Sequence, residues 1–213
     1  MTKVIERYTL LIIGMLALFG VSVQFIISIN RAISEDNSIS QVVISMLGYF
    51  TILTNTFAAA VLTIFGLLPN SRIGKVFATP EVFGCVVSSM LWVGIGFHLL
   101  LSDYWLPDGM EAVSNYLNHY IVPSTLLIVW LVFPPEAQIP KRTPLLWEVY
   151  PVIYGAYIII RGEIIDKYPY PFFDINVIGY PKALWNGLVI LIVILGIGYF
   201  VRAVVNLSSR LQR

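Results

Sequence analysis

Charge is scarce in this sequence, and its scarcity excludes a soluble globular domain. Only 12% of the 213 residues are charged and 58% are hydrophobic, whereas a soluble domain carries about 25% charged residues. A chain with half that charge density cannot cover a water-facing surface of this size. The mean hydropathy of +0.82 agrees that lipid is the main solvent.

Cysteine, histidine and clustered basic residues are also few. The single cysteine, Cys85, excludes an intramolecular disulfide, and we interpret it as a small buried hydrophobe. The formal net charge is +1 and no basic cluster occurs, so we expect no nucleic-acid partner. Two histidines without a convergent carboxylate make a poor zinc site, and we expect neither a metal nor a cofactor.

Long apolar runs are what the sequence has in abundance. A hydrocarbon core of roughly 30 Å needs about 20 helical residues, and six runs approach or exceed that length. The six predicted spans are Tyr8–Ser28, Gln41–Leu67, Val82–Ser102, Leu117–Phe133, Trp147–Ile165 and Ala183–Asn206. The runs are continuous rather than alternating, which favours helices over a barrel. We therefore predict an all-α, polytopic membrane bundle of six transmembrane helices, forming a single domain over residues 1–213.

Lysine and arginine in short loops predict the orientation of such a bundle, because they are enriched on the cytoplasmic side. With both termini in the cytoplasm, the nine inner residues are Lys3, Arg7, Arg72, Lys75, Lys141, Arg142, Arg202, Arg210 and Arg213. The four outer residues are Arg31, Arg161, Lys167 and Lys182. This excess predicts cytoplasmic termini and an integral multi-pass protein, in the inner (plasma) membrane if the chain is bacterial.

The second span carries polar side chains where polarity is costly. Gly48, Thr51, Thr54 and Asn55 follow a helical spacing that puts them on one face. Such a face has two interpretations. It can be a helix–helix contact, since small and polar residues are common there, or it can line a site.

Further polar residues are biased toward the outer leaflet in the predicted topology. They are His98, His119 and Arg161, together with the hydroxyls of the second span. Arg161 also belongs to a stripe along the fifth span, with Tyr150, Tyr154 and Tyr157. Each also has a structural interpretation, because tyrosine anchors interfaces and arginine extends its charge to the headgroup region. The shared bias toward one leaflet favours a pocket that opens outward.

Three segments together resemble a known family. They are Tyr49–Thr51 in the second span, Leu117–His119 followed by Pro123 in the fourth, and Tyr170–Asp174, which reads Tyr-Pro-Phe-Phe-Asp, after the fifth. Their order and spacing resemble the androgen-induced membrane hydrolases of the FAR-17a type and their bacterial six-span relatives. The resemblance covers most of the chain.

This resemblance implies a hydrolase of lipid esters. The animal members cleave fatty acid esters of hydroxy fatty acids, with a threonine nucleophile and a histidine inside the membrane. Carried over, the nucleophile is Thr51 and the histidine is His119, with Thr54 and His98 as secondary candidates. The sequence departs from the animal pattern, because it has one histidine instead of two in this segment and a one-residue difference in the spacing to Pro123.

The chemistry needs further groups. A threonine hydroxyl needs an adjacent base, and a tetrahedral oxyanion needs hydrogen-bond donors. Asn55, one turn from Thr51, is the first candidate donor; Arg161, Tyr154 and Tyr157 are alternatives for the oxyanion or for a substrate carboxylate.

The expected partner is a lipid or long-chain acyl substrate held in the bilayer. We expect its chain between the second, fourth and fifth spans, among Phe57, Val122 and Ile153.

Other function classes stay open at the sequence level. Buried Thr, Asn, His and Arg also line transporters and channels, although the chain shows no inverted repeat. A haem carrier using His98 and His119, and a purely structural role, are further alternatives. The sequence leaves the oligomeric state and the substrate undetermined.

Overall fold

The structure is a computed structural model that describes residues 2–135 and 137–211, with side chains from 4 to 207 apart from residue 136. In chain order the helices are α1 (Thr2–Ser34), α2 (Ile39–Met46), α3 (Phe50–Leu67), α4 (Arg72–Phe77), α5 (Pro80–Leu100), α6 (Gly109–Tyr116), the π-helix η1 (Leu117–Ile121), α7 (Val122–Val132), α8 (Thr143–Trp147), α9 (Val149–Ile165), the 3₁₀-helix η2 (Pro171–Phe173) and α10 (Ile175–Leu211). The described residues contain no strand, and the predicted all-α class is confirmed.

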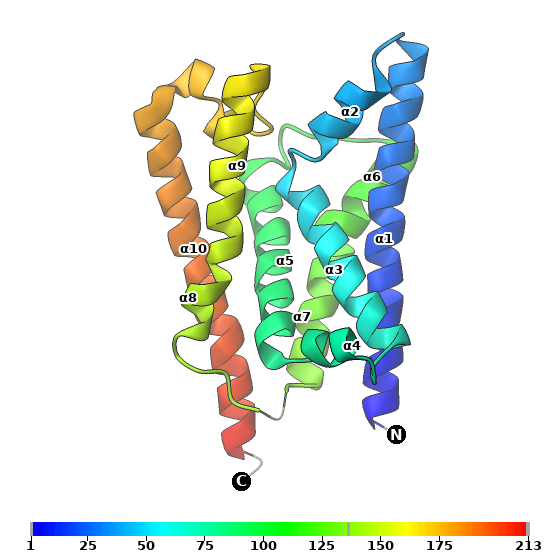
Figure 1. Cartoon of the computed structure of the whole chain (residues 1–213), viewed down its shortest axis with the longest axis vertical. Helices are drawn as coiled ribbons and strands as arrows, with labels where there is room; N and C mark the ends of the chain where they lie inside the picture. The colour runs from blue at the N-terminus through cyan, green and yellow to red at the C-terminus, as the bar shows by residue number, and fades with distance from the viewer. Residues whose placement is uncertain (1, 136, 212–213) are drawn as a thin grey trace.

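The long helices run up and down in one bundle (Figure 1). α1 packs along α3, and α5 packs against α3, α7 and α10. α9 and α10 lie together at one side of the bundle, beyond α5. The start of α1 and the end of α10 lie at the same end of the molecule, and α2 lies at the other end (Figure 1).

Within the residues that the structure describes, five helical segments are long and apolar enough to cross a membrane. They are Val4–Ser34, Phe50–Leu67, Pro80–Leu100, Thr143–Ile165 and Ile175–Leu207. Their outward faces carry large apolar side chains; on α10, Leu188, Ile192 and Phe200 are each about half exposed or more. A soluble monomer rarely exposes such a continuous apolar surface. The chain is therefore built as an integral multi-pass membrane protein.

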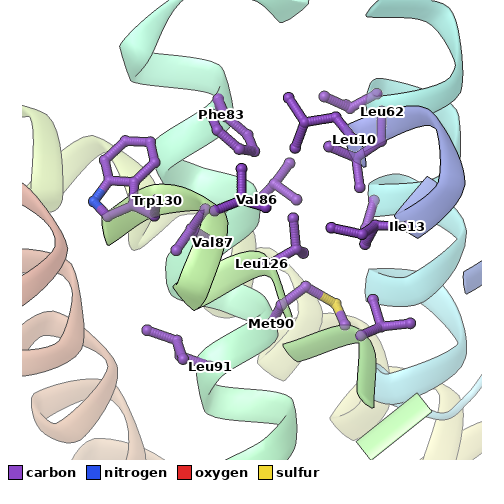
Figure 2. Packing of buried hydrophobic residues seen from close by; sticks show 14 of the residues in the cluster. Leu10, Ile13, Leu62, Phe83, Val86, Val87, Met90, Leu91, Leu126 and Trp130 are labelled. Carbon is purple, nitrogen blue, oxygen red and sulfur yellow. The ribbon is translucent and has the colours of Figure 1, made fainter. Parts of the chain in front are cut away.

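The main core joins α1, α3, α5, α7 and α10 (Figure 2). Leu10 of α1 and Leu62 of α3 point toward Met90 of α5 and Leu126 of α7, and all four are almost fully buried. Trp130 of α7 is fully buried, meets Phe83 edge to face at 5.2 Å, and donates from Nε1 to the Val201 carbonyl of α10 at 3.0 Å. This tryptophan thus ties α7 to both α5 and α10.

The predicted second span, Gln41–Leu67, is wrong as one continuous helix. The structure divides it into α2 and α3, with a break at 47–49. Gly48 therefore lies outside the helix that carries Thr51, and Thr51 lies in the first turn of α3 instead of deep within a longer helix. Nothing in the sequence indicated this break, because the residues on both sides of it are mostly apolar.

The predicted fourth span, Leu117–Phe133, begins too late. α6, η1 and α7 follow one another without a gap from Gly109 to Val132. The polar residues of α6 interrupt the apolar run, so the sequence did not show that the helix begins there. Two of these residues have partners in α1. The buried Ser114 hydroxyl donates to the Gly20 carbonyl at 2.8 Å, and Glu111 pairs with Arg31 at 3.0 Å.

The last span also begins earlier than predicted. α10 starts at Ile175 rather than Ala183, and it contains a kink at Gly179, whose φ of 72° and ψ of 160° are not helical. Glycine adopts positive φ at little cost, and Pro181 follows directly after the kink. This first segment of α10 closes the end of the bundle near η2.

Trp130→Ala is expected to destabilise the protein by about 3–5 kcal/mol, because it removes a large buried side chain and leaves a cavity. The measurement is the thermal midpoint in detergent. Trp185→Ala is the matched control, since Trp185 lies on α10 with 64% of its side chain exposed. Equal shifts for the two variants would contradict this assignment of the core.

Candidate active site at the start of α3

Three side chains from one face of α9 hold the break between α2 and α3. The Tyr154 hydroxyl donates to the Gly48 carbonyl at 2.8 Å, and the Tyr157 hydroxyl donates to the Leu47 carbonyl at 3.3 Å. Nη2 of Arg161 donates to the Ile44 carbonyl at 3.1 Å. A broken helix in lipid must bond its free carbonyls within the protein, and α9 supplies those donors.

These contacts change the expected roles of Tyr154, Tyr157 and Arg161. Both hydroxyl protons are committed to backbone carbonyls, and Arg161 also donates through Nη1 to the Lys167 carbonyl at 3.2 Å. A Cβ on Gly48 would lie 2.9 Å from Cζ of Arg161, so glycine is needed where the arginine crosses the break. Arg161 lines a polar pocket with Asp166, Lys167 and Asp174, different from the cavity that contains Thr51.

The structure brings the Thr51 hydroxyl and the His119 imidazole together. Thr51 Oγ1 lies 3.2 Å from His119 Nε2, and His119 Nδ1 lies 3.1 Å from the Asn115 carbonyl. A carbonyl only accepts hydrogen bonds, so the neutral ring carries its proton on Nδ1. Nε2 is then the acceptor, and the threonine hydroxyl is the donor. This is the arrangement that a general base needs toward a nucleophile.

His119 owes its position to η1 and to α5. Its ring stacks on Phe97 of α5, with ring centroids 3.8 Å apart and planes 21° apart. A Cβ on Gly94 would lie 2.9 Å from the His119 carbonyl oxygen, so α5 approaches η1 closely at a glycine. Single π turns inside helices often occur at functional sites. Here the π turn carries the imidazole.

Asn55 lies one turn beyond Thr51, as predicted, but its amide is occupied. Nδ2 donates to the Thr51 carbonyl at 3.0 Å and to the Asn118 carbonyl at 3.3 Å. An amide has two N–H donors, so neither is left for an oxyanion. Asn55 instead ties the first turns of α3 to η1.

The secondary candidates lie away from this pair. Thr54 is fully buried, and its hydroxyl bonds to the Tyr150 hydroxyl at 2.9 Å. His98 is exposed, and its Nδ1 lies 3.4 Å from the Tyr120 hydroxyl. Both nitrogens of His119 are engaged in hydrogen bonds, so the resting geometry leaves neither free as the axial haem ligand considered above.

An apolar cavity of about 290 Å³ adjoins Thr51. α5, α9 and α10 form its walls, and Phe172 and Phe173 of η2 line one end. Hydroxyl groups enter the lining from Thr51, Tyr154 and Tyr170; nearly all other lining side chains are aliphatic or aromatic.

The cavity differs from the predicted one between the second, fourth and fifth spans. Val122 is fully buried in the core, Phe57 packs against that core, and Ile153 is 62% exposed. α10 also forms a wall of the cavity, and its residues in that wall are apolar, so no polar side chain marked this wall in the sequence.

Tyr170 is the residue that sequence reasoning did not assign to the site. The Phe50 amide donates to its hydroxyl oxygen at 3.0 Å, and Tyr170 lines the same cavity as Thr51. The signal was present, because Tyr170 opens the Tyr170–Asp174 segment. Asp174, at the other end of that segment, accepts from the Asn176 amide at 3.1 Å and so begins α10.

The geometry offers a hydroxyl, a base in the accepting tautomer and an adjoining lipophilic cavity. Among the described residues, no three or more His, Cys, Asp or Glu side chains gather as a metal site. Compared with known protein families, curated proteins and solved structures, the chain gives no match. The function of the protein must therefore be inferred from the geometry of the site.

Nitrogen-15 NMR of the histidine rings tests the tautomer. The chain has two histidines, so a His98→Gln variant isolates the signals of His119. At pH 8, where an ordinary imidazole is neutral, we expect protonated Nδ1 and unprotonated Nε2. Thr51→Val is expected to shift the Nε2 resonance without changing the tautomer, because the Asn115 carbonyl sets it. A ring protonated on Nε2 would contradict this site.

Proposed function

We propose that the protein is an intramembrane hydrolase of lipid esters, with Thr51 as the nucleophile and His119 as the general base. The observation that carries this proposal is the 3.2 Å contact from Thr51 Oγ1 to an Nε2 that can only accept. A threonine hydroxyl is a weak nucleophile unless a base takes its proton during attack. General-base assistance of this kind contributes about 10²–10⁴-fold to the rate.

The acylation step balances with these two side chains. Thr51 Oγ1 bonds to the ester carbonyl carbon while its proton passes to His119 Nε2, and the carbonyl electron pair moves onto oxygen. When the tetrahedral intermediate collapses, the C=O bond reforms and the bond to the alkoxide breaks. The alkoxide takes the proton from Nε2 and leaves as an alcohol, and the acyl group stays on Thr51.

Deacylation repeats the sequence with water. His119 Nε2 takes a proton from the attacking water, the acyl carbon forms a bond to the water oxygen, and the bond to Oγ1 breaks. The proton returns to Oγ1, and a free fatty acid leaves. The Asn115 carbonyl keeps Nδ1 protonated throughout and stabilises the transient imidazolium, a role that a carboxylate fills in other hydrolases.

The cavity supports a substrate with a long acyl chain. Its α10 wall runs from Ala183 to Ile194, which is about 16 Å of helix at 1.5 Å per residue. Apolar walls around a few hydroxyls suit an ester whose chain lies along α10 and whose carbonyl meets Thr51. Fatty acid esters of hydroxy fatty acids, or similar acyl esters, have this chemistry.

The same proposal places the protein in the membrane with six spans and both termini cytoplasmic, in the inner membrane if the chain is bacterial. Five helical segments meet the length and apolarity expected of a span. The start of α1 and the end of α10 lie at one end of the bundle (Figure 1), which requires an even number of crossings. The run from α6 through η1 to α7 supplies the sixth.

Removal of either reacting group is expected to abolish hydrolysis. Thr51→Val keeps the volume of the side chain but lacks the hydroxyl, so ester cleavage should fall to background. His119→Ala should lower kcat by about 10²–10⁴-fold. The assay is release of fatty acid from a long-chain ester by purified protein in detergent.

Thr54→Val is the matched control for Thr51→Val, because it removes a buried hydroxyl one turn away that bonds to Tyr150. We expect it to retain activity and to retain labelling of Thr51 by a fluorophosphonate lipid probe. Hydrolysis that survives loss of the Thr51 hydroxyl would overturn the proposal.

The sixth span has its own test in labelling with a membrane-impermeant maleimide. In a Cys85→Ala background, Ser38→Cys and Asp108→Cys should react in intact cells. Asn70→Cys and Lys141→Cys should react only after permeabilisation, because one crossing separates each from an outer loop. Equal accessibility of positions 108 and 141 would show that the α6–α7 run does not cross.

A further inference from the structure

We propose that Tyr170 is a third catalytic residue, whose hydroxyl donates a hydrogen bond to the oxyanion of the tetrahedral intermediate on Thr51. This inference rests on the proposed hydrolase function and deepens it. It also assigns a function to the Tyr170–Asp174 segment, through its first residue.

Tyr170 lies at the reacting centre. Its hydroxyl oxygen accepts from the Phe50 amide at 3.0 Å, in the first turn of α3, and so lies next to Thr51, the following residue. Tyr170 is 8% exposed and lines the same cavity as Thr51. A buried hydroxyl thus lies beside the nucleophile, in the cavity proposed to hold the substrate.

The Tyr170 hydroxyl has a proton that is available for a hydrogen bond. Its oxygen already accepts from Phe50, so its own proton points elsewhere, toward Thr51 Oγ1 or the Tyr154 hydroxyl oxygen. Both oxygens can accept, because Thr51 donates to His119 Nε2 and Tyr154 donates to a backbone carbonyl. When Oγ1 bonds to the ester carbon, the carbonyl oxygen gains a negative charge next to Oγ1. The Tyr170 hydroxyl then donates to that oxygen, and no covalent bond of Tyr170 changes.

The other candidate donors are occupied or lie elsewhere. Both amide hydrogens of Asn55 bind backbone carbonyls, and the Tyr154 hydroxyl donates to Gly48. Arg161 donates to the Ile44 and Lys167 carbonyls and lines a different pocket from Thr51. Of the three hydroxyls that line the cavity, Thr51 is the nucleophile and Tyr154 donates to Gly48, which leaves Tyr170 as the hydroxyl donor.

The ring of Tyr170 is held firmly enough to act as a preorganised donor. It stacks on Phe172 with centroids 5.0 Å apart and planes 6° apart, and it meets Tyr49 edge to face at 5.8 Å. The start of α3 adds the positive end of a helix dipole beside the developing charge. A donor fixed before reaction costs no reorganisation when the charge appears.

Tyr170→Phe tests the inference, because it keeps the stacked ring and removes only the hydroxyl. We expect kcat for a long-chain ester to fall by about 10²–10³-fold, the effect of losing one oxyanion donor, with KM changed less than about twofold since the acyl chain still binds the same walls. Tyr104→Phe is the matched control, because Tyr104 is 84% exposed and does not line the cavity that contains Thr51. It should keep kcat.

A second measurement separates catalysis from structure. A long-chain trifluoromethyl ketone adds to Thr51 and leaves an oxyanion, whereas the corresponding alkyl ether binds without reacting. Tyr170→Phe should weaken binding of the ketone by about the same factor as it lowers kcat, and it should leave binding of the ether unchanged. A purely structural role would weaken both inhibitors. If Tyr170→Phe does not fold, 3-fluorotyrosine at position 170 keeps the hydroxyl, and its more acidic proton should tighten the ketone.

The outcomes distinguish the two proposals. Hydrolysis that requires Thr51 but proceeds within about twofold of normal kcat in Tyr170→Phe overturns the oxyanion role alone. An equal loss of ketone and ether binding, or an unchanged ketone affinity with 3-fluorotyrosine, does the same. Absence of Thr51-dependent hydrolysis in the wild type overturns the hydrolase and this inference together.

Discussion

The structure of the site depends on one constraint, which is that backbone carbonyls at a helix break in lipid must find donors within the protein. α9 meets this requirement at the α2–α3 break with Tyr154, Tyr157 and Arg161. Because the helix can end and a new one begin there, Thr51 lies in the first turn of α3. In that turn the Phe50 amide has no partner within the helix and is free to donate to Tyr170. An unbroken helix would have used that amide internally.

Apolarity made much of the fold predictable. The runs around Tyr8–Ser28 and Val82–Ser102 correspond to α1 and α5, since a helix in lipid requires little more than length and apolar side chains. The errors occur where polar groups have specific partners. Composition does not reveal that α9 donates to the carbonyls at 47–48, or that the Ser114 hydroxyl has a carbonyl of α1 as its acceptor.

The candidate site was predictable to the level of residue types. The resemblance pointed to Thr51 and His119, and the structure brings their side chains together. The sequence could not assign the donors, because Asn55 and Arg161 are both chemically suitable. Only the structure shows that Asn55 donates to backbone carbonyls and that Arg161 lines a different pocket from Thr51. Tyr170 belongs to a motif of the resemblance, but its place beside Thr51 was not predictable, since 118 residues of chain separate the two.

The π turn has a consequence for how this chain can vary. Buried side chains recur at every fourth position through α6, η1 and α7, at Ser114, Asn118, Val122, Leu126 and Trp130. In an ordinary α-helix such a series drifts by about 40° per step, and four steps would carry its end away from the bundle. The wider turn, in which the Val122 amide bonds to the Leu117 carbonyl, takes up part of that drift. This segment can therefore accept substitutions more readily than the insertion or deletion of a residue. A change of length would rotate the His119 imidazole relative to the buried side chains of α6 and α7.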